Sequence, residues 1–238
     1  MVNVAIKKSR GFTLIELMLA SALLMTIMFS GYYAYSLYTQ KWQKRVDTYW
    51  QSINQGVGVD ALTKLLQSTS KYIVENEDGK LGVYFEASNE VMRFISNSPI
   101  MSSGSALVEL EIVENNGYKK LIYREMNLQG SPLYFLSEVE NNSSWHHQIV
   151  LLDKLTEVSW LFYGWTTFQN ALTQVGITEI TGNEDTRVNY QLHEPDKIRV
   201  LPVHVNLRIS VSDQLSELKV DFPNHSVFSV VANARSGA

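Results

Sequence analysis

Residues 12–38 read FTLIELMLASALLMTIMFSGYYAYSLY, and this stretch decides how the rest of the chain is interpreted. Glu16 is its only acidic or basic residue. As a helix rising about 1.5 Å per residue, the stretch is long enough to cross a hydrocarbon core about 30 Å thick. Aromatic residues, which favour the membrane interface, gather at its far end; they are Tyr32, Tyr33, Tyr35, Tyr38 and Trp42. We therefore predict a single N-terminal membrane helix.

A cleaved secretory signal peptide is one alternative for this segment. The apolar region of a signal peptide usually has about 7–15 residues, which is shorter than the stretch found here. The small residues of a cleavage site would have to come from Ala34-Tyr35-Ser36, which lies among bulky tyrosines. A plain membrane anchor is the other alternative, and it explains the length of the stretch but not Glu16.

Glu16 is costly in lipid. A charged side chain near the middle of a bilayer helix costs about 2.5–3.5 kcal/mol, so it indicates a function and requires a partner. The apolar stretch holds no cation. Cleavage of the chain after Gly11 would create one, because Phe12 would then carry a free α-amino group.

The sequence KKSRGFTLIELMLASALL, residues 7–24, resembles the leader and cleavage site of type IV pilins and type II secretion pseudopilins. In this comparison the basic cluster Lys7, Lys8 and Arg10 belongs to the leader. The resemblance implies that a prepilin peptidase cuts between Gly11 and Phe12 and N-methylates Phe12. It further implies that Glu16 pairs with the N-terminal amine of a neighbouring subunit and sets the axial register of the filament.

Two later segments resemble a narrower branch of this family. LLDKLTEVSWLFYGW (151–165) and KIRVLPVHVNLRISV (197–211) are similar to the C-terminal half of J-type minor pseudopilins of type II secretion and of W-type minor pilins of type IV pili. A tryptophan-rich linker expected of the J type is not evident between them. The chain has no cysteine, unlike many major pilins, and its Glu16 differs from K-type tip subunits, which typically lack that carboxylate.

After the membrane stretch, apolar residues continue at three- and four-residue spacing, which is typical of an amphipathic helix. The predicted stripe consists of Trp42, Val46, Tyr49, Ile53, Val57, Ala61 and Leu65, widened by Trp50, Leu62 and Leu66. We expect the head domain to cover it, with a kink allowed at Gly56 and Gly58. The expected organisation is a leader at 1–11, a membrane and filament-core helix at 12–38, an amphipathic helix at 39–68 and a periplasmic head at 69–238.

Beyond residue 70 the apolar pattern has a period of two, as in half-buried antiparallel strands. We predict strands at 81–86, 90–96, 108–112, 118–125, 132–138, 148–152, 157–164, 203–211 and 217–222. Glu114-Asn115-Asn116-Gly117 has the residues of a hairpin turn, and 166–196 is interpreted as a long polar excursion with a short helix. The expected fold is α+β, with one long N-terminal helix packed on two antiparallel sheets.

Composition and scattered polar residues favour no catalytic or metal chemistry. The net charge of −4 gives no basic footprint for nucleic acid, so we expect no nucleic-acid partner. His146-His147 lacks nearby zinc ligands, and Glu75–Gly79 and Asn183-Glu184-Asp185 match no calcium loop, although both could supply oxygens to calcium. We expect no enzyme, no metal site and no cofactor.

The sequence therefore predicts a minor pilin or pseudopilin that helps to initiate or tip a type IV pilus or a type II secretion pseudopilus. The alternative is a binding module at the filament tip, such as an adhesin or a cargo receptor. The expected partners are a prepilin peptidase, other pilins or pseudopilins and the bacterial inner membrane. Three basic residues lie on each side of the helix, so the positive-inside rule does not determine its orientation. The cytoplasmic leader and periplasmic head follow from the resemblance.

Overall fold

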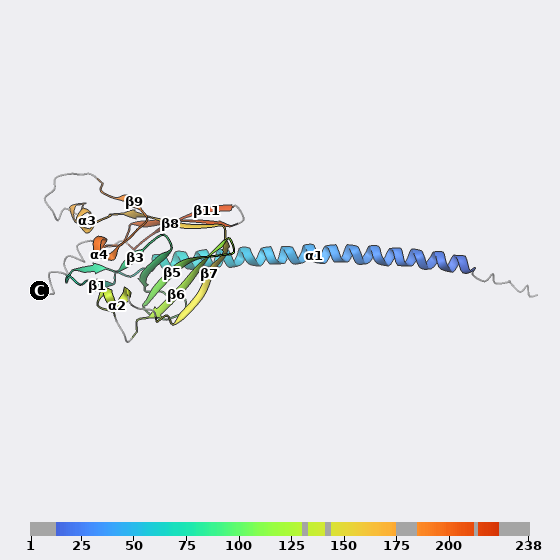
Figure 1. Ribbon diagram of the computed structural model, residues 1–238, viewed down its shortest axis with the longest axis horizontal. Helices are drawn as coiled ribbons and strands as arrows, with labels where there is room; N and C mark the ends of the chain where they lie inside the picture. Colours follow the sequence, from blue (N-terminus) through green and yellow to red (C-terminus); the bar gives the residue numbers. More distant parts are fainter. Residues whose placement is uncertain (1–12, 130–132, 141–143, 175–184, 212–213, 224–238) are drawn as a thin grey trace, which may run out of the picture. The chain divides into compact units, whose positions relative to one another are not determined.

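The computed structural model describes residues 13–129, 133–140, 144–174, 185–211 and 214–223 (Figure 1). The chain divides into two compact units, residues 1–53 and 54–238. One helix, α1 (Leu14–Gln67), contributes to both units and is continuous through Gly56 and Gly58, so its hydrogen bonding shows no break there. The remaining elements all belong to the second unit, which we call the head.

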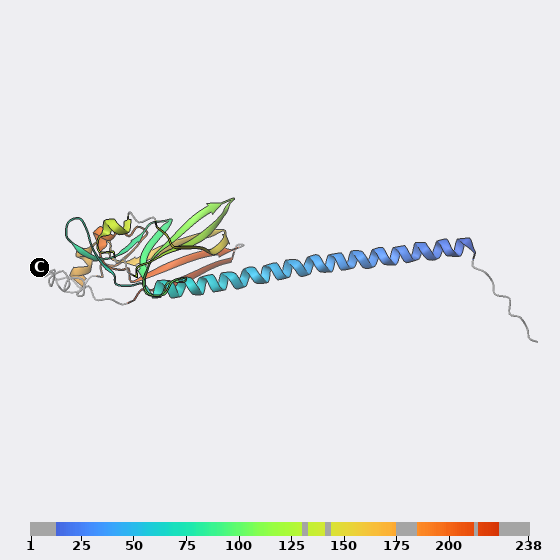
Figure 2. The ribbon, with the colours of Figure 1, turned by 90° about the horizontal axis from the view of Figure 1, so that it is seen from below.

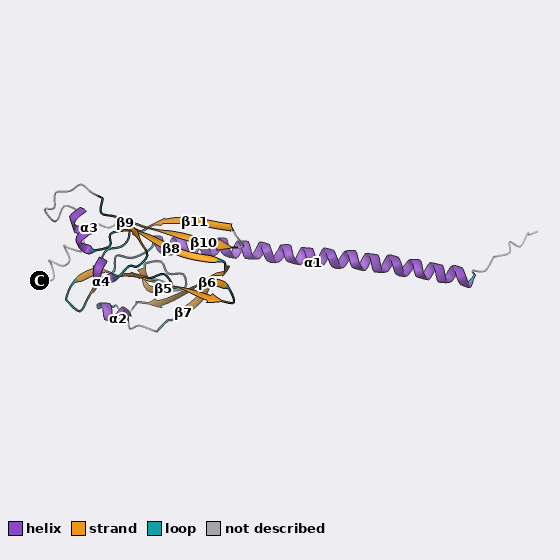
Figure 3. Cartoon of the chain, turned by 45° about the horizontal axis from the view of Figure 1, so that its top comes forward, coloured by secondary structure: helices purple, strands orange, loops and turns teal. Residues whose placement is uncertain are grey.

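In its described residues, the head consists mainly of antiparallel strands with three short helices (Figure 3). The helices are α2 (Leu136–Glu140), α3 (Phe168–Gln174) and α4 (Pro195–Ile198). The strands are β1 (Ile73–Glu75), β2 (Leu81–Val83), β3 (Phe85–Ala87), β4 (Val91–Ser96), β5 (Ala106–Asn115), β6 (Tyr118–Asn127), β7 (His147–Leu155), β8 (Glu157–Gly164), β9 (Val188–Tyr190), β10 (His204–Val211) and β11 (Gln214–Asp221). The predicted α+β class is confirmed.

Two larger sheets make up most of the head. The five-stranded sheet has the order β3-β4-β5-β6-β7 and the four-stranded sheet the order β11-β10-β8-β9. A third sheet, β1-β2, was not predicted. The β5–β6 hairpin turns at Asn116 and Gly117, whose φ angles of 53° and 79° are those of the primed turn that the sequence indicated.

The core forms where the two larger sheets meet the last turns of α1, which lie along one side of the head (Figures 1 and 2). Leu62, Leu65 and Leu66 of α1 are almost fully buried there. They pack with inward residues of both sheets, which include Phe85, Phe94, Leu110, Trp160, Phe162 and Leu207. Removal of this apolar area from water is the main stabilising contribution.

The predicted apolar stripe of α1 is only partly correct within the head. Its last members are buried, but Val57 is 65% exposed. The helix face that meets the sheets instead runs through Gly58, Val59, Leu62 and Leu66. The predicted stripe included Leu62 and Leu66 but not Gly58 and Val59, and a glycine, which has no apolar side chain, gives no signal in such a pattern.

Two strand predictions are wrong. Residues 132–138 were predicted as a strand, but α2 begins at Leu136. Its Leu136 and Val139 are both buried at helical spacing, and the Glu138 carboxylate accepts hydrogen bonds from the backbone N–H groups of Tyr134 and Phe135. Residues 81–86, predicted as one strand, divide at Tyr84 into β2 and β3, which belong to different sheets.

Gly58 allows α1 to approach β7 closely. A Cβ built on Gly58 would overlap the carbonyl oxygen of Leu151 and lie 2.6 Å from Cδ2 of Leu152, which is closer than real Cβ contacts. A Cβ built on Gly56, two residues earlier in the same helix, would have nothing within 4 Å. The two glycines therefore provide a matched pair.

We predict opposite effects for alanine at these two positions. Gly58→Ala should destabilise the head by about 1–3 kcal/mol, because the added methyl group overpacks the contact with β7. Gly56→Ala should stabilise it by about 0.5–1 kcal/mol, because alanine costs less backbone entropy in a helix. Urea unfolding of the chain in detergent, followed by tryptophan fluorescence, measures both. Equal effects of the two substitutions would contradict the close approach of α1 to β7.

Candidate functional site

The candidate site predicted from the sequence is the start of the membrane helix. Lys7, Lys8, Arg10, Gly11 and Phe12 lie outside the described residues. Thr13 is the first described residue, and α1 begins at Leu14. Among the predicted site residues, the structure therefore places Glu16.

Thr13 and Glu16 form a reciprocal cap at the start of α1. The backbone N–H of Thr13 donates to Oε2 of Glu16 at 2.9 Å, and the Thr13 hydroxyl donates to the same oxygen at 3.0 Å. In return, the backbone N–H of Glu16 donates to Oγ1 of Thr13 at 3.3 Å. This is a capping box, in which the first and fourth residues of the motif satisfy each other's otherwise unpaired N–H groups.

The capping box fixes where the Glu16 carboxylate points. The carboxylate turns back toward the N-terminal end of the helix. Phe12 precedes this end in the sequence. The positive end of the helix dipole also favours an acidic group there. The Thr-Leu-Ile-Glu pattern is a sequence-level signal for this cap. The sequence reasoning considered Glu16 only as a charge in lipid and missed the cap.

The helix after this cap has the surface of a membrane segment. Within the described residues, one helical stretch, Leu14–Val46, is long and apolar enough to span a bilayer, and none of its most apolar window is buried in the chain. Its hydroxyl groups are satisfied inside the helix. Ser21 donates to the carbonyl of Met18 at 2.9 Å, Thr26 to that of Ala22 at 2.9 Å and Ser30 to that of Thr26 at 2.8 Å. Such internal bonds suit lipid, where water cannot replace them.

The family model of the prokaryotic N-terminal methylation motif matches residues 6–32. This window contains Gly11, Phe12 and Glu16 together with the first part of α1. The motif indicates a type IV pilin-like prepilin. Processing by a prepilin peptidase and assembly with other pilins follow from it in general terms. No curated protein matches the chain.

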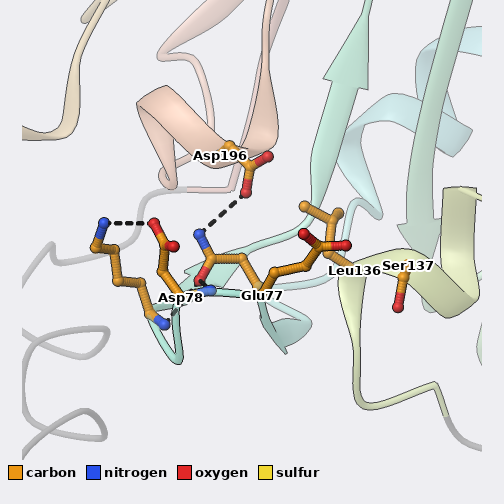
Figure 4. Close-up of a pocket in the computed structure, with 7 residues that line it drawn as sticks. Glu77, Asp78, Leu136, Ser137 and Asp196 are labelled. Carbon is orange, nitrogen blue, oxygen red and sulfur yellow. Dashed lines mark hydrogen bonds and ion pairs between the residues drawn. The ribbon is translucent and has the colours of Figure 1, made fainter.

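The polar turn at residues 75–79, considered above for calcium, lines a cavity of about 380 Å³ (Figure 4). The Asp78 carboxylate there pairs with Nζ of Lys80 at 2.7 Å, and the side-chain amide of Asn76 donates to Oδ1 of Asp196 at 3.1 Å. Over the described ranges, no group of three or more histidine, cysteine or acidic side chains could hold a metal ion. The carboxylates of Asp78 and Asp196 are thus engaged by protein donors.

The remaining candidate ligands from the sequence are the second acidic segment and the histidine pair. Asn183 and Glu184 lie outside the described residues, and Asp185 pairs with Nε of Arg187 at 2.7 Å. His146 and His147 are exposed, and Nδ1 of His146 accepts a hydrogen bond from the backbone N–H of Asn127 at 3.3 Å. The pilin-like family to which the motif points is structural rather than catalytic.

The head contains buried charges that the period-two pattern did not reveal. Glu109 alternates with apolar residues in a strand predicted to be half-buried, yet it is itself 3% exposed. It pairs with Nε of Arg93 at 2.6 Å and with Nη1 of Arg124 at 2.5 Å. The strand register sets Glu86, Arg93, Glu109, Arg124 and Gln148 in one row across all five strands. Opposite charges on neighbouring strands stabilise this register.

Glu125 is a second buried carboxylate, and it holds the loop between β4 and β5. It accepts hydrogen bonds from the hydroxyls of Ser102 and Tyr123 and from the backbone N–H of Met101 at 3.1 Å. The Tyr123 hydroxyl in turn accepts from the backbone N–H of Ile100 at 3.0 Å. Burial favours the neutral form of Glu125, but these hydrogen bonds outweigh it and hold the pKa of Glu125 below its ordinary value of 4.5.

We predict that Glu125→Gln destabilises the head at neutral pH by about 1–3 kcal/mol, because buried donors then lose a charged acceptor. A carboxyl whose pKa is lowered by folding stabilises the fold above its unfolded pKa. The difference between wild type and variant should therefore be full near pH 7 and shrink as the pH falls below about 4.5. Urea unfolding between pH 3 and 7 measures it.

Glu217→Gln is the control for this experiment. Glu217 pairs with Arg208 at 2.9 Å, but both side chains are more than half exposed. Its loss should cost less than about 1 kcal/mol. Equal losses of stability in the two variants would show that the loop does not depend on the buried carboxylate.

We predict that co-expression with a prepilin peptidase shortens the chain by the eleven residues of its leader and leaves N-methylated Phe12. Gly11→Val should block cleavage, because the enzyme must approach a backbone that lacks a side chain. Ser9→Val, which leaves Gly11 in place, is the control and should be cleaved. Mass spectrometry of the mature N-terminus reads out all three proteins, and an N-terminus at Leu37 would establish a secretory signal peptide instead.

Proposed function

We propose that this chain is a structural minor subunit of a type IV pilus or of a type II secretion pseudopilus, which helps to initiate or tip the filament. The observation that carries the proposal is the methylation motif at residues 6–32, continuous with a helix whose apolar surface the chain leaves uncovered. A helix that is apolar all round must be covered by lipid or by other helices. In a subunit that moves from bilayer to filament, lipid would cover the helix first and other helices would cover it afterwards.

Glu16 has a specific part in this proposal. In a lone subunit, the capping box satisfies the carboxylate locally through Thr13. When apolar helices pack together and exclude water, a negative charge between them still requires a positive partner. The α-amino group of Phe12, created by cleavage, is the cation that a neighbouring subunit can provide. The pairing stabilises one axial register of neighbouring helices more than the others.

Two features of the head support a minor rather than a major subunit. The chain has no cysteine, so it cannot form the C-terminal disulfide loop of many major pilins. The two segments that resemble J-type and W-type minor subunits, 151–165 and 197–211, contribute strands that pair directly. β8 lies against β10, with Trp160 opposite Leu207. The resemblance thus concerns the two central strands of the four-stranded sheet.

The same proposal gives the location of the subunit. The leader lies in the cytoplasm, α1 crosses the bacterial inner membrane once, and the head lies in the periplasm. The absence of cysteine makes the head independent of the oxidising chemistry of that compartment. The proposed partners are a prepilin peptidase and other pilins or pseudopilins.

We predict that Glu16→Gln leaves membrane insertion and cleavage intact but weakens association with partner pilins by at least about tenfold, or about 1.4 kcal/mol. Glutamine can still complete a capping box, so this substitution removes the charge and keeps the cap. Thr13→Val is the matched control, because it removes the two hydrogen bonds that the Thr13 hydroxyl makes in the cap and keeps the charge of Glu16. Membrane fractionation, the extent of cleavage and co-purification with partner subunits provide the readouts.

Two results would contradict the register role of Glu16. Normal association of the Glu16→Gln protein would show that the charge is not required and that the head alone drives assembly. Equal loss of association in Glu16→Gln and Thr13→Val would show that the helix cap, rather than the pairing with Phe12, is what assembly needs.

A further inference from the structure

His193 lies in the connection between β9 and β10 and is fully buried. Its neighbour Leu192 is 57% exposed, so this connection turns a polar ring inward and an apolar side chain outward. Burial of apolar area alone would favour the reverse arrangement. The inward position of His193 is therefore set by the contacts of its ring and backbone inside the head.

The ring of His193 belongs to an aromatic cluster in which the two larger sheets meet. It lies edge-on to Phe85 of β3, with ring centroids 4.9 Å apart. Phe85 also makes edge contacts with Phe162 of β8 and with Phe222, which follows β11. Nδ1 of His193 lies 3.0 Å from the hydroxyl oxygen of Tyr190, and among the described residues the buried Nε2 has no hydrogen-bond partner. The ring therefore makes one polar contact and otherwise fills an apolar space.

The backbone of His193 covers an edge of the five-stranded sheet. β3 is the first strand of that sheet, and Ala87 at its end exchanges two backbone hydrogen bonds with His193, at 3.0 and 2.8 Å. The same connection is attached again where the N–H of Val83 donates to the carbonyl of Arg199 at 3.0 Å. Arginine stays charged near neutral pH, whereas a histidine can gain a proton there. The attachment that acid can alter is thus the one at His193.

Burial opposes a positive charge on this ring. It lowers the pKa of His193 from its ordinary value of 6.5 to about 3. Tyr190 stays uncharged, because burial raises the pKa of its hydroxyl. The charged groups on the surrounding elements are held in ion pairs of their own, which are Glu86 with Arg93, Glu194 with Lys197, and Asp221 with Lys219. A protonated ring must therefore leave the cluster to be solvated.

We propose that His193 is an acid-sensitive latch, which in its neutral form holds the connection between β9 and β10 on β3 and on protonation releases it. Release frees the backbone groups of Ala87 and with them an edge of the five-stranded sheet. An open edge can accept a strand from another chain. The latch belongs to the head alone, so it does not depend on a role in a filament.

The direction of the pH effect follows from the two states of the latch. The released ring binds a proton near pH 6.5, whereas the latched ring stays neutral down to about pH 3. The latched state is therefore favoured fully above pH 6.5 and progressively less as the pH falls from 6.5 toward 3. Between pH 7.5 and pH 5, the ratio of released to latched molecules should rise about thirtyfold.

Hydrogen exchange of the full-length chain in detergent tests the proposal, after correction for the pH dependence of exchange itself. The backbone N–H groups of Ala87 and His193 should lose protection about thirtyfold between pH 7.5 and pH 5, while those of β5 and β6 keep theirs. His193→Phe keeps an aromatic ring against Phe85 and removes the titration, so its protection should not change with pH. His204→Phe is the matched control, because His204 stacks on Tyr163 instead, and this variant should behave as wild type does.

Three exchange results would overturn the latch. They are unchanged protection of Ala87 in wild type, an equal loss in wild type and in the His193→Phe protein, and an equal loss in β5 and β6, which would mean that the whole head unfolds. The NMR signals of the His193 ring in the wild-type chain provide a second measurement that needs no variant. A neutral ring at pH 5 supports the latch, and a ring that gains its proton near pH 6.5 in the folded chain overturns it.

Discussion

The contact between the last turns of α1 and the two larger sheets is the constraint on which the head depends. Leu62, Leu65 and Leu66 fill the space that the two sheets leave between them, and Gly58 brings the helix backbone against the edge of β7. Without these turns, the inward apolar residues that pack with them would lose part of their cover from water. One continuous helix therefore includes an apolar segment compatible with a single-pass membrane anchor and a part of the core of the head.

This double role explains why the two ends of α1 differ so much. The first part has apolar side chains on every face, satisfies its hydroxyl groups internally and carries one carboxylate held by a cap. The part within the head has a narrow buried face and an exposed polar one, with Lys64 and Asp60 paired at 2.6 Å. Lipid demands that no polar group be left unsatisfied, whereas a head domain demands only that one face be apolar.

The sequence predicted the features that local patterns determine. The membrane stretch, the long helix, the β5–β6 turn and strand β8 could be read from periodicity and turn chemistry. Features set by contacts between distant residues could not. In the alternating sequence pattern Glu109 takes a polar position. Only the register with Arg93 and Arg124 on the neighbouring strands shows why it is buried. The break at Tyr84 also depends on a partner elsewhere, since its backbone N–H donates to the carbonyl of Tyr72. At the candidate site, the position of Glu16 was predictable, and its cap with Thr13 was readable but overlooked.

The continuity of α1 also has a mechanical consequence. The two units divide inside α1, so a load applied along this helix reaches the head through the backbone of residues 54–67. That load arrives at three leucines buried side by side and at a chain that leaves α1 directly into the sheet, where the N–H of Ser70 donates to the carbonyl of Ile95 at 2.6 Å. A load applied along α1 therefore acts first on the buried core of the head.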